Sequence, residues 1–222
     1  LSHTAAPVSL LDQDKVDKFL PPRRAFSFLL DVENPITMGN VAFPDHYMEF
    51  RYLIQRAMER AKQVIREVEE EFYEISSRKY GGLVEEYRCN DADIILILMG
   101  AWSGDAKVCA DKLREEGLRV GVLRIRFIRP LPIEEIKRVS MGRKAIIVVD
   151  RDISFGGAGI LFTEVSSILQ QNNVTVRGFI AGLGGRDVTA KDFTQMVRQV
   201  YADLEVGEKR SRVEWYGVKE VI

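Results

Sequence analysis

The fold is decided by two stretches, AIIVVDRDISFGGAG at residues 145–159 and VRGFIAGLGGRDVT at residues 176–189. Each begins with an apolar run, passes through a glycine-containing turn and leads into a segment with helical periodicity, at 160–170 and 190–204. Strand, glycine turn and helix in this order are typical of α/β domains. Such domains bind ligands or partners where their strands end, so we expect any functional site at these turns.

The same alternation extends from residue 83 to residue 204. Continuous apolar runs such as IILILM at 94–99 predict buried central strands of a mostly parallel sheet. The predicted strands are 84–88, 94–99, 119–126, 145–149 and 176–181, and the predicted helices are 105–116, 133–139, 160–170 and 190–204. Right-handed crossovers place helices on both faces of such a sheet. The predicted fold is therefore a three-layer α/β domain with about five strands.

The first 82 residues follow a different pattern. Five of the seven prolines lie in residues 1–44, which predicts an extended linker containing one short helix from Asp12 to Leu20. Apolar residues then recur at three- and four-residue steps from residue 45 to about 78, which predicts one helix roughly 50 Å long. Its apolar stripe packs either on a part of a longer protein or over its own domain.

These patterns divide the chain into four parts. We expect a linker at 1–44, a connecting helix at 45–82, an α/β domain at 83–204 and a charged C-terminal tail at 205–222, anchored by Trp215 and Tyr216. The chain begins without methionine and with a proline-rich segment, so we expect a C-terminal part of a longer protein.

Composition excludes several functions. The formal net charge of −1 does not indicate binding to nucleic acid or to a membrane surface. No apolar run reaches the roughly 20 residues of a membrane span. The only cysteines, Cys89 and Cys109, have no metal-binding spacing and read as reduced thiols of a cytoplasmic protein. Residues 83–204 contain no histidine, so no Ser/His/Asp or Cys/His set can form there. We therefore predict no catalytic residue and no metal ligand.

Three turns remain as candidate sites. In the first, Ser103 and Gly104 follow the strand at 94–99 and could expose backbone N–H groups to an anion. Alternatively this is a plain turn in which Ser103 caps the helix, and we favour that interpretation.

The second turn contains Gly156, Gly157 and Gly159. It lacks the full G-x-G-x-x-G spacing and the lysine of a P-loop, so nucleotide binding is disfavoured. We favour a role for these glycines in the close approach of two backbone segments.

The third turn contains Gly182, Gly184 and Gly185, which permit positive φ angles. Thr189 and Asp192 after it form a helix-capping pair. Arg186 beside Asp187 either recognises a phosphate or carboxylate or forms a local ion pair, and we favour the ion pair.

Several segments in order resemble the α subunit of the 2-oxoacid:ferredoxin oxidoreductases, above all pyruvate:ferredoxin oxidoreductase (pyruvate synthase). The similar segments are LSHT (1–4) with PV (7–8), FLPP (19–22), YMEFRY (47–52), GLVEEYR (82–88), LRIR (123–126), DRDISFGG (150–157) and AGLGGRDVT (181–189). Together they cover nearly the whole chain, so the resemblance is specific although each motif is modest.

The resemblance implies a chemistry for the complete enzyme. The family decarboxylates a 2-oxoacid on thiamine diphosphate with magnesium, passes electrons through iron–sulfur clusters to ferredoxin and transfers the acyl group to coenzyme A. It also implies that residues 83–204 form a transketolase C-terminal-like domain, and that β-, γ- and δ-type subunits are partners. The family's thiamine-contacting glutamate and cluster cysteines have no counterpart here.

Two hypotheses follow for this chain. In the first, it serves assembly and subunit contact, binds no cofactor of its own and carries no catalytic centre. In the second, it is an anion- or coenzyme A-binding module that uses Arg186 and the helix N-terminus after Gly159. A free-standing nucleotide-dependent enzyme would need a catalytic set that residues 83–204 do not supply.

Overall fold

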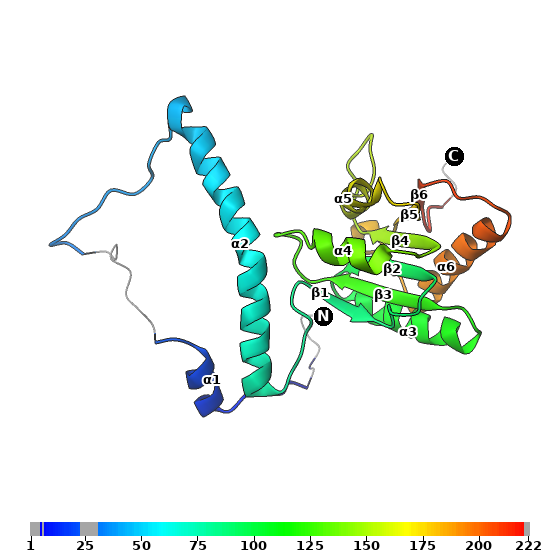
Figure 1. Cartoon of the computed structure of the whole chain (residues 1–222), viewed down its shortest axis with the longest axis horizontal. Helices are drawn as coiled ribbons and strands as arrows, with labels where there is room; N and C mark the ends of the chain where they lie inside the picture. The colour runs from blue at the N-terminus through cyan, green and yellow to red at the C-terminus, as the bar shows by residue number, and fades with distance from the viewer. Residues whose placement is uncertain (1–4, 6, 23–30, 220–222) are drawn as a thin grey trace. The chain divides into compact units, whose positions relative to one another are not determined.

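The computed structural model describes residues 5, 7–22 and 31–219. The LSHT segment with His3 lies outside the described residues, as do residues 6, 23–30 and 220–222. The chain divides into two units, residues 1–80 and residues 81–222. The first unit is helical and the second is built on a sheet (Figure 1).

Helices α1 (Gln13–Phe19) and α2 (Pro44–Ser76) form the first unit, as the sequence predicts. Pro44 occupies the first turn of α2, where its missing N–H costs nothing, and the helix ends before Ser77, which is left-handed with φ 57°. The Phe19 ring lies edge-on to Phe72 at 5.3 Å, which packs α1 on α2. None of the helices in the described chain is both apolar enough and long enough to span a bilayer.

The second unit contains a six-stranded sheet. Its strands are β1 (Val84–Tyr87), β2 (Ile94–Met99), β3 (Val120–Ile125), β4 (Ala145–Asp150), β5 (Thr175–Ile180) and β6 (Arg212–Trp215). The spatial order is β1-β3-β2-β4-β5-β6, and only β1 is antiparallel to its neighbour. The apolar runs predicted as central strands are β2 and β4, which are buried because helices cover both faces.

Four helices cover this sheet in pairs. They are α3 (Trp102–Glu115), α4 (Ile133–Ser140), α5 (Ile160–Leu169) and α6 (Ala190–Glu205). Helix α3 packs with α6 on one face, and α4 packs with α5 on the other (Figure 1). The three-layer α/β prediction is therefore confirmed. Helix α3 begins at Trp102, three residues before the predicted start at Asp105.

The sixth strand is a difference from the sequence-based prediction. Residues 205–222 were expected to be a tail, but Arg212–Trp215 pairs in parallel with β5. Arg177 on β5 is fully buried, and its guanidinium donates to Asp203 of α6 at 2.7 Å and to Glu214 of β6. Glu214 supplies the counter-charge to this buried cation. The ion pair explains why a strand with alternating polar residues pairs with β5 at the edge of the sheet.

The order of connections creates a switch point between β2 and β4. From β2 the chain moves outward to β3, then crosses back over β2 to β4 and continues to β5 and β6 in the other direction. The carboxyl ends of β2 and β4 are therefore neighbours whose following loops diverge. Open α/β sheets bind their ligands in such a crevice. We call the turns that follow β2, β4 and β5 (residues 99–105, 150–160 and 181–189) the crest.

Candidate functional site

The first turn of the crest is closed by its own hydrogen bonds. The Ser103 hydroxyl donates to the Gly100 carbonyl at 2.9 Å, and the Gly104 amide donates to the Ala101 carbonyl at 2.9 Å. Ser103 lies inside α3, and its side chain accepts no helix amide, so it does not act as the predicted N-cap. The Gly104 amide is already committed and is not available to an added anion.

The second turn is held by two carboxylates. Asp150, the last residue of β4, accepts hydrogen bonds from the amides of Leu161 at 3.0 Å and Phe162 at 2.9 Å. Asp152 accepts from the Ile160 amide at 2.9 Å. The first three amides of α5 thus bind carboxylates of the same chain, which also suit the positive end of the helix. An external anion at this helix N-terminus would have to displace them.

Gly159 is the glycine that this arrangement requires. Its φ of −61° is available to any residue, so the reason is not conformational. A Cβ at this position would overlap the Asp150 carboxylate. The loop before it is closed by the Ser154 amide on the Ala158 carbonyl at 3.0 Å and the Gly157 amide on the Ser154 carbonyl at 2.8 Å, while Gly156 turns the chain at φ 81°.

Asp150 is the most perturbed acid of the crest. It is 2% exposed, and burial raises its pKa from 3.8 to about 6, against the opposing effect of the two amide hydrogen bonds. The nearby charges of Asp152 and Glu164 add to the rise. A buried acid that titrates near neutrality is a frequent mark of a functional site, although here the same carboxylate caps a helix.

The third turn is held by the C-terminal segment. Gly182, Gly184 and Gly185 have φ angles of 68°, 66° and 86°, as predicted for residues without a side chain. The Arg186 guanidinium donates to the Gly217 carbonyl. Arg186 and Asp187, which are both described, form no ion pair with each other. The predicted local pair is therefore replaced by a link to the residues after β6.

The predicted capping pair at the start of α6 is confirmed. The Thr189 side chain and the N3 residue Asp192 form a reciprocal capping box, in which the Thr189 amide donates to Asp192 at 2.8 Å. Tyr216, which follows β6, donates its hydroxyl to the other Asp192 oxygen at 3.1 Å. The predicted anchor Tyr216 thus holds the C-terminal segment against α6.

Trp102 brings the three turns together at the switch point. A Cβ on Gly182 would overlap the Trp102 ring, which shows how closely the first and third turns approach. The Arg151 guanidinium lies 5.4 Å from the centre of the same ring, and its Nε donates to the Gly182 carbonyl at 3.1 Å. A cavity of about 250 Å³ remains here, lined by Met99, Gly100, Ala101, Trp102, Val149, Asp150, Arg151 and Asp152.

The apolar runs and glycines of the sequence predict the turns of the crest but not the residues that connect them. Asp150, Arg151, Asp152 and Trp102 were not identified as site residues. The sequence signal is a carboxylate at the end of an otherwise apolar strand, followed by a helix whose N-cap residue, Gly159, has no side chain to accept a hydrogen bond. A helix that lacks a local cap takes its hydrogen-bond acceptors from elsewhere.

The described residues do not fit the magnesium ion or the iron–sulfur clusters that the resemblance implies for the complete enzyme. Within the described ranges, no group of three His, Cys, Asp or Glu side chains could hold the magnesium ion. Both cysteines are buried, and burial raises the pKa of the Cys89 thiol to about 11, which opposes the thiolate that an iron–sulfur cluster needs. No catalytic step is therefore assigned to these residues.

The fold places the second unit in the class of open α/β domains, and its switch point lies between β2 and β4. Comparison with known proteins gives the family. Residues 92–193 match the profile "Pyruvate:ferredoxin oxidoreductase core domain II", and residues 1–70 match "Pyruvate flavodoxin/ferredoxin oxidoreductase, thiamine diP-bdg". The chain belongs to this family, which confirms the resemblance seen in its sequence.

Relatives of known name cover almost all of the chain. The ketoisovalerate oxidoreductase subunit VorA of Pyrococcus horikoshii is 42% identical over 99% of this chain and 56% of its own length. The pyruvate synthase subunit PorA of Methanothermobacter thermautotrophicus is 42% identical over 99% of this chain and 55% of its own length. The chain thus spans about half the length of these relatives.

Among solved structures, a split-gene transketolase described as an inactive β4 tetramer aligns with a TM-score of 0.41 and 20% identity. The alignment covers 53% of this chain and 39% of that chain.

Proposed function

We propose that this chain is part of a 2-oxoacid:ferredoxin oxidoreductase, in which it serves assembly and subunit contact. The complete enzyme would oxidatively decarboxylate a 2-oxoacid, with pyruvate as our first choice, to the acyl-coenzyme A and reduce ferredoxin. Thiamine diphosphate, magnesium and iron–sulfur clusters would be held by other parts of the complex. Relatives named for pyruvate and for ketoisovalerate are equally similar to this chain, so the substrate needs a direct assay.

The observation that carries this proposal is the state of the crest. The amides at the start of α5 are occupied by Asp150 and Asp152, and Arg186 is bound to a backbone carbonyl. At the same time Phe155, at the tip of the second turn, is 91% exposed. An aromatic ring exposed to solvent on a turn that is closed by backbone hydrogen bonds is a typical anchor for a protein partner. These features favour contact with another subunit over an anion or coenzyme A site.

The domain boundaries belong to the same proposal. Residues 1–44 would be the end of a preceding thiamine-enzyme domain with its linker, 45–82 the connecting helix, 83–204 the α/β domain and 205–222 the C-terminal segment. Apolar side chains along α2, including Phe50, Ile54 and Val64, are exposed in this chain, which supports packing against a part of a longer protein. We further propose a cytoplasmic location, with β-, γ- and δ-type subunits as partners.

Binding to the purified chain tests the first part of the proposal. Titration calorimetry with thiamine diphosphate plus Mg²⁺, and separately with coenzyme A, should give no saturable heat. Tight binding of either compound would overturn the assignment of this chain to assembly. A loss of coenzyme A binding in Arg186→Ala would then favour the alternative, an anion-binding module.

Reassembly tests the second part. The chain is mixed with the other subunits, and with a separate polypeptide that carries the part of a relative such as PorA that this chain does not match. Association is followed by analytical ultracentrifugation. Phe155→Ser should weaken association, whereas Val206→Ser, which removes another exposed apolar side chain after α6, should not. Pyruvate-dependent reduction of ferredoxin should require the reassembled complex. Equal association of both variants would show that the crest is not part of the interface.

A further inference from the structure

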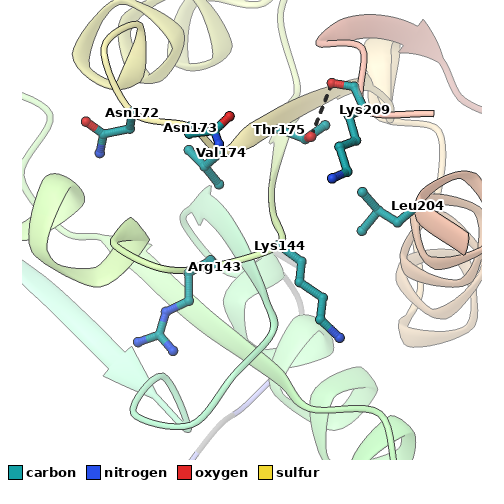
Figure 2. A pocket seen from close by; sticks show the side chains of 8 residues that line it. All are labelled: Arg143, Lys144, Asn172, Asn173, Val174, Thr175, Leu204 and Lys209. Atoms are coloured by element: carbon teal, nitrogen blue, oxygen red, sulfur yellow. Dashed lines mark hydrogen bonds between the residues drawn. The ribbon is translucent and has the colours of Figure 1, made fainter. Parts of the chain in front are cut away.

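A second cavity lies at the opposite edge of the sheet from the crest. It is about 420 Å³ in volume and sits where β4, β5 and β6 begin (Figure 2). Its walls come from the loops before these three strands and from the end of α6. The lining residues are Arg143, Lys144, Asn172, Asn173, Val174, Thr175, Leu204 and Lys209. Three of the eight are cations and none is a carboxylate.

Among the residues that the structure describes, no carboxylate forms an ion pair with the guanidinium of Arg143. Its Nε donates to the Val139 carbonyl at 2.8 Å, and one of its terminal nitrogens donates to the carbonyls of Ala92 at 2.8 Å and Asn90 at 3.3 Å. These neutral acceptors fix the guanidinium in place. They do not cancel its charge, so it contributes a positive potential to the cavity.

The second cation shares its counter-charge. Lys144 lies 3.2 Å from Asp93, but Asp93 also binds Arg119 at 2.6 Å. Asp91 also acts on Arg119 but is paired with Arg114 at 2.7 Å, so the three cations and two carboxylates of this group leave a net positive charge at this wall. Because the whole chain has a formal net charge of −1, the positive charge at this edge is local.

Lys209 supplies the third cation. In the part of the chain that the structure describes, its ammonium group forms no ion pair or hydrogen bond, and in Figure 2 the side chain extends toward the space between Val174 and Leu204. Its loop is held by the Thr175 hydroxyl, which donates to the Lys209 carbonyl at 3.2 Å. The cation is thus presented from an anchored backbone.

The remaining walls are neutral donors and apolar surface. The side-chain amides of Asn172 and Asn173 form no hydrogen bond with the described residues and can each donate two. Val174 and Leu204 offer an apolar wall. Cations and amides beside a small apolar surface suit a small molecule that has a doubly charged head and a short organic part, and the volume is in the lower range of ligand pockets.

We propose that this amino-edge cavity binds the phosphate group of a small phosphorylated molecule. Lys209 and the asparagine amides would contact the phosphate oxygens, and the fixed charges of Arg143 and Lys144 would favour a dianion over a monoanion. The site is separate from the crest and does not depend on the proposed role in assembly.

Titration calorimetry on the full chain tests the proposal with three probes: inorganic phosphate, pyrophosphate and phenyl phosphate. Pyrophosphate should bind in a saturable manner and more weakly as salt rises. Lys209→Ala should reduce its affinity about tenfold, as expected for the loss of one charged hydrogen bond. Lys191→Ala, an exposed lysine at the other end of α6, is the matched control and should leave the affinity unchanged. Equal affinity in both variants would overturn the proposal.

A second readout locates the ligand without any substitution. Titration with pyrophosphate should shift the side-chain amide signals of Asn172 and Asn173 in proton–nitrogen spectra. Assignment of those signals comes from Asn172→Asp and Asn173→Asp, each of which removes one pair. Binding without a shift at either asparagine would contradict the site. Tighter binding of phenyl phosphate than of inorganic phosphate would assign the site to a phosphorylated organic molecule, and equal binding would assign it to free phosphate.

Discussion

The crossings from β4 to α5 and from β5 to α6 look alike in sequence but are stabilised in different ways. Both run from a buried strand through glycines to a helix. Helix α6 is capped locally by Thr189 and Asp192, within four residues of sequence. Helix α5 is capped by Asp150, which precedes Leu161 by eleven residues and lies at the end of the strand.

The difference concerns what each helix start depends on. The reciprocal hydrogen bonds of the α6 cap are exposed and lie within one turn, to which Tyr216 adds one contact from beyond β6. The α5 cap forms only when β4 is packed, because Asp150 reaches the helix from a buried strand end through the space left by Gly159. The α5 cap therefore couples helix formation to sheet formation, whereas the hydrogen bonds between Thr189 and Asp192 do not require a packed strand.

Asp150→Ala should have the largest effect. The substitution leaves two amides of α5 without acceptors next to a buried strand end, and each unsatisfied buried donor costs about 1–3 kcal/mol. We expect the free energy of unfolding to fall by about 3 kcal/mol at pH 4, where the raised pKa keeps the folded-state carboxyl protonated and no buried charge offsets the loss; the measurement is urea unfolding. A loss of less than about 1 kcal/mol would show that water replaces the carboxylate and that the cap is not coupled to the strand.

Gly159→Ala should have the next largest effect. The added methyl group overlaps the Asp150 carboxylate, and such overpacking costs about 2 kcal/mol. Gly184→Ala in the third turn is the matched variant: nothing lies near its Cβ position, and only its φ of 66° is unfavourable, at about 1 kcal/mol.

A double-mutant cycle sharpens this contrast. Once Asp150→Ala has removed the carboxylate, Gly159→Ala should cost much less than it does alone, whereas the cost of Gly184→Ala should not change. Additive effects of Asp150→Ala and Gly159→Ala, measured by the same unfolding assay, would rule out the steric reason for Gly159.

The same contrast shows how far the sequence can be read. The length of the continuous apolar run predicted the bounds of β2 correctly, because a strand that is buried on both faces is apolar at nearly every position. They missed β6, in which Arg212 and Glu214 are polar because they meet the buried Arg177 network. A strand whose polar side chains face a buried cation cannot be distinguished from a charged tail by its pattern.

The candidate site shows the same limit. The Thr189–Asp192 cap was predicted because both partners lie in one turn. The role of Asp150 was missed because its partners lie eleven and twelve residues away and are brought to it by tertiary packing. The sequence favours an ion pair between Arg186 and its neighbour Asp187, but the return of the chain after β6 brings the Gly217 carbonyl to the Arg186 guanidinium.

The two carboxylates should also titrate with opposite effects on stability. Burial raises the pKa of Asp150 from 3.8 to about 6, so the folded state binds the extra proton and stability falls as pH rises between these values, by at most about 1.4 kcal/mol per pH unit. For Asp192, burial alone would raise the pKa, but hydrogen bonds from Thr189 and Tyr216 outweigh it and hold the pKa below 3.8. Its contribution is therefore lost as pH falls below about 4.

Asp150→Asn isolates the first of these effects. The variant keeps the size of the side chain and one acceptor but cannot titrate, so the free energy of unfolding should lose its decline between pH 4 and pH 6 relative to the unsubstituted chain. The measurement is a set of urea curves at several pH values. Parallel pH profiles for the two proteins would mean that Asp150 keeps an ordinary pKa and that its burial is relieved by water.

Thr189→Ala should have the smallest effect, about 1 kcal/mol, because it removes one exposed cap and leaves no buried donor unsatisfied. Since this cap is local, hydrogen exchange should become faster only in the first turn of α6. Asp150→Ala should instead accelerate exchange in both α5 and β4, because that cap joins the helix to the strand. If Asp150→Ala accelerated exchange only in α5, the Asp150 cap would affect only its own helix, as the Thr189 cap does. The distinction between a local and a tertiary cap would then be wrong.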